Sequence, residues 1–399
     1  MEATHRTEGD LMAHEERTPG PGRNVAVLRK EHGLSQVQLA RRSGVSLSML
    51  SKIEIGDRAL TQGMAAAIAA GMGITLDEVL GKAPVTSEDN LKALRAAMRR
   101  FDLAGEPPRS LMELETDLTK LTDHRFNTDL NDVLELLPGV LSRAQNHAHD
   151  TQTPDAWATV ADVYSTVYWV AARHRWLDLC ELASLKQMLA AERATPLVGI
   201  VAARDNAGMF LNNGDFAGGL GVIEQAISKA ESTLTGEDRA FGLGVLHLRG
   251  LTLAGRLRDK TAADQHIAKA EQYAAEFSAD IIKHEMHFGP QNTAVHIIST
   301  SGDLRRHSKA LQVSQELQRQ DIKLPATRVG PMHLDTSRAR LALGDRDGAL
   351  DSLEQAWEVA PQLAKVHPTS QELFRVMVSM HKRSNPRLNK IAKRVKISI

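Results

Sequence analysis

The chain has 399 residues and one cysteine, Cys180, and its 49 basic and 49 acidic side chains cancel. A single cysteine excludes an internal disulfide framework and agrees with a reducing cytoplasm, where it is expected to pack as a buried thiol. The longest apolar stretch, residues 64–74, is too short to cross a bilayer, so we expect a soluble, cytoplasmic protein of more than one domain with no membrane partner.

The first 22 residues carry five acidic and two basic side chains. They lack the basic region and the apolar run that together make a signal peptide. We expect residues 1–22 to be a disordered, polar N-terminal arm.

Residues 34–56 have the sequence LSQVQLARRSGVSLSMLSKIEIG, which predicts two short helices joined by a tight turn. Ser35 and Gln38 form the S-x-x-Q pattern of a capping box at the start of the first helix. Gly44 marks the turn, because glycine adopts a left-handed backbone conformation without steric cost. Ser46 is expected to cap the second helix through its hydroxyl.

Flanking segments extend this pair to five helices. A preceding helix is expected to end at Gly33. Thr61 is expected to cap a fourth helix that runs to Met72, and a second capping box, formed by Thr75 and Glu78, predicts a fifth.

The second helix of the pair has one apolar and one polar face. At the 3.6-residue period, Met49, Leu50 and Ile53 face the first helix. The opposite face is expected to protrude and to enter the major groove of DNA, where hydroxyl groups and a lysine hydrogen-bond to base edges or phosphates. That face carries Leu47, Ser48, Ser51 and Lys52.

Residues 23–81 resemble the Cro/repressor, or XRE, type of helix-turn-helix domain. The resemblance implies that Gln36 holds a DNA phosphate and that Arg58 grips the DNA backbone. Gly63, and the absence of a proline near Thr61, depart from the usual pattern of the family. A plain αα-hairpin core without DNA binding is the alternative for so short a motif. The residues that the resemblance places on bases are Ser46, Leu47, Ser48 and Lys52.

The distribution of charge favours a dimer. Residues 23–82, which we call the head, carry eight basic and five acidic side chains, a net charge of +3. Neutralised phosphates supply much of the affinity for DNA, so this small excess favours two heads on one palindromic operator of double-stranded DNA. We therefore expect a homodimer.

After residue 87 the apolar spacing is helical and no convincing strand pattern appears, so the rest of the chain is expected to be all-α. Residues 87–101 are expected to form a connecting helix, which the Gly-Glu-Pro-Pro sequence at 105–108 ends. The expected segments are the head at 23–82, a connecting helix and linker at 83–110, a repeat domain at 111–383 and a basic tail at 384–399.

A short pattern recurs at the junctions between helices of the expected repeat domain. It contains Gly214, Gly255, Gly302 and Gly344, which lie 41, 47 and 42 residues apart, and a copy without glycine falls at residues 174–176. Each junction separates two apolar helices, which predicts stacked helical hairpins that form a solenoid. The pattern resembles a divergent tetratricopeptide repeat (TPR), whose usual period is about 34 residues.

The register of these repeats predicts a ligand-binding strip. Residues ten and six positions before each junction lie one helical turn apart on the same face. Asparagine can pair with a peptide backbone and arginine can clamp a carboxylate, so a peptide or a small acidic signal would suit the strip. A solvated helix face is the alternative. The candidate ligand-binding residues are Tyr164, Tyr168, Arg204, Arg249, Asn292, His296 and Arg338, and Gly208, Val245 and Leu334 occupy the remaining positions.

No motif indicates an enzyme. His284 and His287 are three residues apart, unlike the histidines of the HExxH zinc motif, and are interpreted as solvated helix residues. His147 and His149 point in different directions on a helix and cannot chelate together. We also find no phosphate-binding glycine loop and no nucleophile elbow, so we expect no catalytic residue, metal or cofactor.

The last segment, residues 381–399, carries seven basic side chains and no acidic one. It is interpreted as a polar cap on the end of the solenoid, with a further contact to DNA as the alternative.

Head and repeats together resemble bacterial one-component regulators, common in actinobacteria, that join an XRE head to a TPR-like sensor. The resemblance implies a DNA-binding transcriptional regulator whose repeat domain senses a signal. The alternative is a DNA-tethered interaction scaffold without a small ligand.

Overall fold

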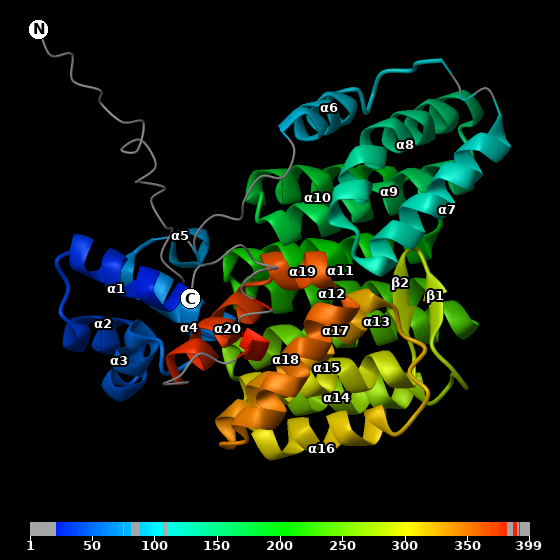
Figure 1. The fold of residues 1–399 in the computed structure, drawn as a ribbon. Helices are drawn as coiled ribbons and strands as arrows, with labels where there is room; N and C mark the ends of the chain where they lie inside the picture. The colour runs from blue at the N-terminus through cyan, green and yellow to red at the C-terminus, as the bar shows by residue number, and fades with distance from the viewer. Residues whose placement is uncertain are drawn as a thin grey trace, which may run out of the picture.

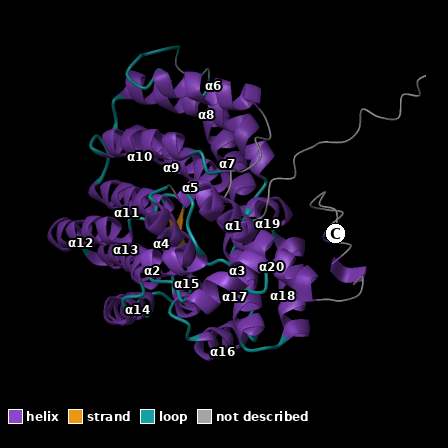
Figure 2. Cartoon of the chain, turned by 90° about the vertical axis from the view of Figure 1, so that its left-hand side faces the viewer, coloured by secondary structure: helices purple, strands orange, loops and turns teal. Residues whose placement is uncertain are grey.

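The computed structural model describes residues 21–74, 76–80, 88–106, 108, 110–380, 386–388 and 391. The expectations for the N-terminal arm up to residue 20, for the capping role of Thr75 and for most of the basic tail lie outside these residues. The described part is almost entirely helical (Figures 1 and 2), which confirms the all-α fold class: a five-helix Cro/repressor-like domain followed by a solenoid of helical hairpins.

Five helices form the head, and their apolar sides meet in a single core. Leu39, Leu50, Ile53 and Ile68 are fully buried there. The helices are α1 Pro21–Glu31, α2 Gln36–Ser43, α3 Leu47–Ile55, α4 Gln62–Met72 and α5 Leu76–Leu80.

The caps predicted for the head are present. The Ser35 hydroxyl accepts the Gln38 N–H at 3.1 Å, and the Gln38 side chain accepts the Ser35 N–H at 2.8 Å, which completes the capping box. The hydroxyls of Ser46 and Thr61 each accept the backbone N–H three residues on. Gly44 turns the chain with a φ of 66°, so sequence and structure agree on both ends of α2 and on the start of α3 and α4.

A buried ion pair, which the sequence did not reveal, fastens three helices of the head together. Arg29 on α1 donates to both carboxylate oxygens of Glu54 on α3, at 2.6 and 2.8 Å, and to the Leu34 carbonyl oxygen at 2.7 Å. Gln36 on α2 donates to the same carboxylate at 2.9 Å. The carboxylate therefore has three donors, which offsets the cost of its burial.

The repeat domain consists of antiparallel helical hairpins that stack in chain order. The hairpins pair α7 with α8, α9 with α10, α11 with α12, α13 with α14, α15 with α16, and α17 with α18. The helices are α6 Glu88–Arg99, α7 Leu111–Asn127, α8 Leu130–Thr151, α9 Pro154–His174, α10 Leu177–Ala191, α11 Pro196–Asn213, α12 Phe216–Thr233, α13 Gly236–Leu257, α14 Lys260–Ala274, α15 Pro290–Asp303, α16 His307–Gln318, α17 Ala326–Ala342, α18 Arg346–Val359, α19 Pro361–Val366 and α20 Pro368–Met380.

The expected connecting helix is part of the repeat domain. It corresponds to α6, whose Leu94 and Met98, with Phe101 just beyond it, are buried in the same core cluster as α8 and α9. The helix therefore covers the first hairpin instead of spanning free between two domains.

Two of the four predicted glycine junctions are turns. Gly214 and Gly344 have φ of 82° and 87°. Gly255 and Gly302 instead lie inside helices, and the chain turns three residues later. A Cβ atom on Gly255 would lie 2.9 Å from a Thr300 methyl group, so close approach of α13 and α15 is the reason for glycine there. The residues that make the later turns are Arg258 and Arg305, with φ of 62° and 61°.

A β-hairpin, which was not expected, interrupts the repeats between α14 and α15. Its strands are β1 Ile281–Lys283 and β2 Met286–Phe288. They are too short for an alternating pattern to show in the sequence. The interpretation of His284 and His287 as solvated helix residues is wrong: His284 turns the hairpin with a φ of 49°, and His287 is buried in β2.

The solenoid curls round until its last helices meet its first ones. In Figure 1 the orange and red helices α17–α20 return across the middle of the repeats. There α17 contacts α7 and α19 contacts α9. The Asn131 N–H donates to Gln362 Oε1 at 3.1 Å, and Val366 joins the core cluster of α8–α10. The inner faces of the hairpins therefore surround a central space.

Among the described residues, no helix is long and apolar enough to span a bilayer.

We predict that Glu54→Ala destabilises the head by about 3–5 kcal/mol, because it leaves the Arg29 charge buried and unpaired. Burial alone would raise the pKa of Glu54, but hydrogen bonds from Arg29 and Gln36 bring it below its ordinary value. The pair's contribution is therefore complete above the ordinary glutamate pKa, and it is lost as the pH falls from there through the lowered pKa of the folded state. Hydrogen exchange of head peptides in the full chain measures both effects.

The exposed Glu31 on α1 provides the matched control. Glu31→Ala should change protection by less than about 0.5 kcal/mol. Equal protection of the head in both variants would show that the ion pair contributes nothing net.

Candidate nucleic-acid interface and central cavity

The outer face of α3 is open to solvent, as the sequence predicted. Leu47 is 44% exposed, and Ser46, Ser48 and Lys52 are exposed around it. Ser51 is half-buried. The opposite face holds the fully buried Leu50 and Ile53, so the core fixes which side of α3 faces outward.

Gln36, which was predicted to hold a phosphate, uses its side-chain nitrogen inside the head. That nitrogen donates to Glu54, as described above. Its backbone N–H lies in the first turn of α2, where no donor has a partner within the helix and anions bind readily. The phosphate contact of Gln36 therefore remains a prediction for the backbone N–H and the second amide hydrogen.

Arg58, which was predicted to grip the DNA backbone, faces the repeat domain. It is half-buried and lines a small cavity of about 90 Å³ between the head and α13–α17. Arg258 and Arg305 line the same cavity, together with Asp303. Arg58 therefore lies at the contact with the repeat domain, and its grip on the DNA backbone remains a prediction.

The head is docked on the repeat domain through its other sides. A Cβ atom on Gly63 would lie 3.0 Å from the Arg256 carbonyl oxygen, so the glycine that departs from the family pattern allows α4 to approach α13. Ala66, also on α4, packs against the core of α11–α13. On the far side the Ser379 hydroxyl of α20 donates to the Gly56 carbonyl oxygen at 3.1 Å.

A buried carboxylate sits in this contact. Glu372 on α20 is 2% exposed and accepts backbone N–H groups of Leu60 and Gly22 from the head. Burial raises its pKa to about 7, although Arg375 and the two N–H groups act in the opposite direction. Glu372 thus gains a proton more readily when the head is docked than it does in water.

The central space of the solenoid holds a cavity of about 270 Å³. The first helices of the hairpins, α7, α9, α11, α13, α15 and α17, all contribute to its wall, and α19–α20 and the head close it. The head residues at its rim are Gln62 of α4 and Leu76 and Leu80 of α5.

Four of the seven residues predicted for the ligand strip line this cavity: Tyr168, Arg204, Arg249 and His296. Gly208, one turn from Arg204, leaves room there, because a Cβ atom on it would collide with the Tyr168 hydroxyl group. The spacing rule therefore found the inward face of α9, α11, α13 and α15. Whether these residues bind a ligand remains a prediction.

The other three strip residues make contacts within the protein. Tyr164 is fully buried and accepts a hydrogen bond from Gln145 at 2.7 Å. Asn292 donates to the His287 carbonyl oxygen at 2.7 Å. Arg338 pairs with Asp303 at 3.0 Å and lines the smaller cavity beside Arg58. These three therefore lie away from the central cavity.

Sequence reasoning missed five arginines of the cavity wall: Arg125 on α7, Arg173 on α9, Arg175 just after it, Arg256 on α13 and Arg328 on α17. Four of the five lie on the first helix of a hairpin, which is the helix that the repeat pattern places on the inner side. Arg328 lies ten residues before Arg338 on the same helix. It does not occupy either of the positions, ten and six residues before the junction, that define the predicted strip.

The cavity is strongly positive. Its wall contains seven arginines against two acidic residues. Burial, with the charges of neighbouring arginines, lowers the pKa of Arg173 and of Arg249 to about 10 and that of Arg328 to about 9. Burial, followed by the charge of Arg173, lowers the pKa of His367 to about 3. At neutral pH the arginines are charged and His367 is neutral.

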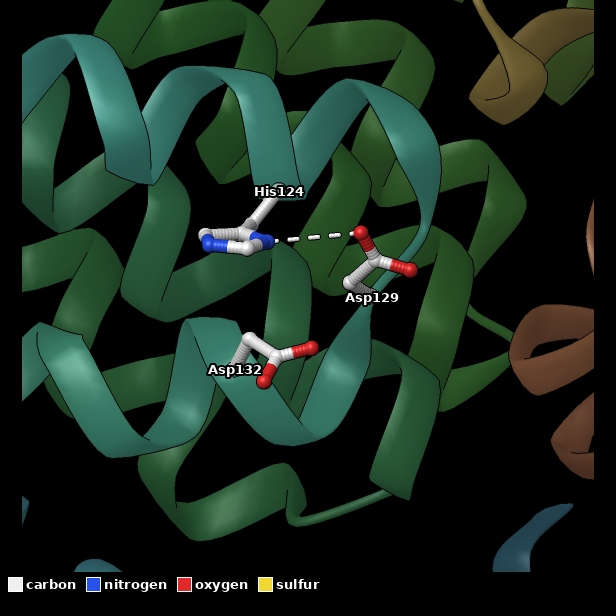
Figure 3. Close-up of side chains that lie close together, drawn as sticks. All are labelled: His124, Asp129 and Asp132. Atoms are coloured by element: carbon white, nitrogen blue, oxygen red, sulfur yellow. Dashed lines mark hydrogen bonds and ion pairs between the residues drawn. The ribbon is translucent and has the colours of Figure 1, made fainter.

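His124, Asp129 and Asp132 place three potential metal-ligand atoms within 4.8 Å of one another at the turn between α7 and α8 (Figure 3). His124 Nδ1 lies 3.3 Å from Asp129 Oδ2. The side chains are half-buried or exposed, and a structural zinc site has four protein ligands. We assign no metal to this group.

Comparison with known proteins supports the assignment of the head. A helix-turn-helix family model matches residues 25–79. These residues are an XRE-type helix-turn-helix domain. The domain indicates a DNA-binding regulator of transcription, while the match leaves most of the chain uncovered and no curated protein sequence matches it.

Three solved structures of PrgX show a weak similarity to most of the chain at 12% sequence identity. They are a point mutant (TM-score 0.28) and the complexes with iCF10 (0.27) and cCF10 (0.24). The matches cover 86%, 94% and 86% of this chain and 95%, 96% and 92% of those chains.

We predict that docking of the head weakens as the pH rises from about 5 to 8. The raised pKa of Glu372 means that its protonated form favours docking, so stability of the docked state is lost between the ordinary glutamate pKa and about 7. Glu372→Gln should remain docked throughout. The docking constant should change at least tenfold, since one pKa unit corresponds to about 1.4 kcal/mol.

The distance between spin labels on Val37→Cys in α2 and Leu185→Cys in α10 measures docking. Both positions are exposed, and Cys180 is fully buried with its pKa raised by burial to about 12, so labels attach only at the introduced thiols. If the distance distribution does not change with pH in either the labelled parent or its Glu372→Gln variant, the prediction is contradicted.

Proposed function

We propose that the chain is a dimeric, sequence-specific transcriptional regulator in which α3 reads base edges and the repeat domain senses a peptide or small-molecule signal. The observation that carries the proposal is the orientation of the docked head. It contacts the repeats through α1, α4 and α5, while the face of α3 with Ser48 and Lys52 stays exposed.

This arrangement supports control by the position of the head. Two heads that bind a palindromic operator have to be separated by about one turn of DNA, roughly 34 Å. The repeat domains would set that separation, because each head rests on α11, α13 and α20. A small rotation of a head on its repeat domain would then change how well the pair fits the two half-sites.

The position of the central cavity supports sensing. Repeats form most of its wall, but Gln62, Leu76 and Leu80 of the head complete it. A bound signal would therefore contact both parts of the chain, and any difference in its affinity for the docked and undocked states would shift the equilibrium between them.

We predict that Lys52→Ala and Ser48→Ala each cost about 1–3 kcal/mol at one base position of the operator and relax specificity there, since both side chains lie on the exposed face of α3. Selecting bound fragments from random duplex DNA with each protein, followed by titration of the selected site, measures the change.

Lys229→Ala on α12 is the matched control, because Lys229 is exposed and lies far from the head in the sequence. It should leave selection and affinity unchanged. Arg58→Ala should weaken binding to all sequences alike. Identical losses on selected and random DNA for Lys52→Ala, Ser48→Ala and Arg58→Ala would refute base reading by α3.

A further inference from the structure

Three cationic side chains of the central cavity have no carboxylate partner among the described residues. The guanidinium groups of Arg173, Arg249 and Arg328 come from α9, α13 and α17, and none lies within ion-pair distance of an acidic side chain that the structure describes. The Nε atoms of Arg249 and Arg328 are buried without a hydrogen-bond acceptor. Such unpaired groups are costly unless an anion meets them.

The acidic residues of the cavity wall are already engaged. Asp205 pairs with Arg204 at 2.7 Å and accepts a hydrogen bond from Ser165 at 2.8 Å. Asp335 pairs with Arg338 at 3.1 Å. If Asp205 or Asp335 moved to pair with one of the three arginines, its present ion pair would be lost.

The arginines line one cavity and so lie close enough to repel one another. Burial lowers the pKa of Arg328 most, and then Arg204, Arg173, Arg125 and Arg249 each lower it further. Charged groups on separate hairpins are thus brought together by closure of the ring, and a small anion placed among them would interact with several at once.

We propose that this cavity binds a compact organic phosphate, held by Arg173, Arg249 and Arg328. A phosphate monoester carries a charge of about −1.5 to −2 and three acceptor oxygens, which suits several arginine forks, whereas a carboxylate offers one charge and two oxygens. The volume of about 270 Å³ lies just below the usual range of about 300–1,000 Å³ for ligand pockets, so a small ligand fits better than an extended peptide.

The rest of the wall suits the organic part of such a ligand. Apolar side chains from several elements line it, and they lie beside the polar groups of Asn212 and Thr252. They include Leu177, Leu211, Val295 and Leu334. Leu76 and Leu80 of the head complete the apolar rim, so the bound phosphate would also bear on docking, a coupling that rests on the regulatory function proposed above.

Thermal unfolding of the full chain without DNA tests the site. The probes are phenyl phosphate, benzoate and succinate at pH 7.5 and equal ionic strength. We expect phenyl phosphate to raise the melting temperature in a concentration-dependent way and the two carboxylates to have little effect. An equal shift with benzoate or succinate, or no shift with phenyl phosphate, would overturn the proposal.

Substitutions of the cavity-wall arginines provide a second test. Affinity for the ligand should fall, while the melting temperature of the unliganded protein should not. Arg249→Met and Arg328→Met should weaken phenyl phosphate at least tenfold, yet the unliganded proteins should melt no lower than the parent, because each change removes a repelling charge. Arg249→Lys keeps the charge but loses the fork and should bind with intermediate affinity. Arg319→Met, at an exposed arginine after α16, is the control and should change neither property.

Lower melting temperatures with unchanged phenyl phosphate affinity in the two methionine variants would mean that the arginines are structural. DNA selection, measured separately, keeps the two proposals apart. Phosphate binding without sequence-specific DNA binding would remove the regulatory function and leave the site, and the reverse result would remove only the site.

Discussion

The closure of the solenoid into a ring is the constraint on which the rest of the structure depends. Because α17 and α19 return to contact α7 and α9, the inner faces of the hairpins converge instead of lining an open groove. Convergence brings arginines from five hairpins into one low-dielectric space, where their charges act strongly on one another. An open superhelix with the same sequence would hold these side chains apart in water.

The head takes part in this closure. Its α4 lies against α13 and its α5 against α11, so the DNA-binding unit forms part of the wall of the cavity. The head therefore borders two charged sites: the arginine-lined cavity and, at α20, the buried carboxylate of Glu372. The exposed face of α3 belongs to neither, which separates the surface for DNA from the surface for control.

The sequence predicted local features well because local interactions determine them. The capping box at Ser35, the turn at Gly44 and the inward side of α3 depend on neighbours within a few residues. The repeat register also located Tyr168, Arg204, Arg249 and His296 on the cavity wall, because a helix fixes which residues share a face.

Long-range partners were not readable from the sequence. The Arg29–Glu54 pair, the direction of Arg58 and the closure of the ring depend on contacts between distant segments. The turns predicted at Gly255 and Gly302 were misplaced, because glycine also occurs where helices pack closely. The β-hairpin was not predicted, because strands of three residues are too short to show an alternation of apolar and polar residues.

The β-hairpin also has a consequence for how the chain folds. The Thr122 hydroxyl of α7 donates to Glu285 at the hairpin tip at 2.7 Å, across 163 residues of sequence, and His284 reaches Asp162 of α9. Most solenoids assemble from neighbour contacts and can nucleate anywhere. Here the first hairpins contact a segment that is synthesised much later. These contacts between distant parts of the sequence are expected to slow closure of the ring, so α7 and α9 lack them during synthesis.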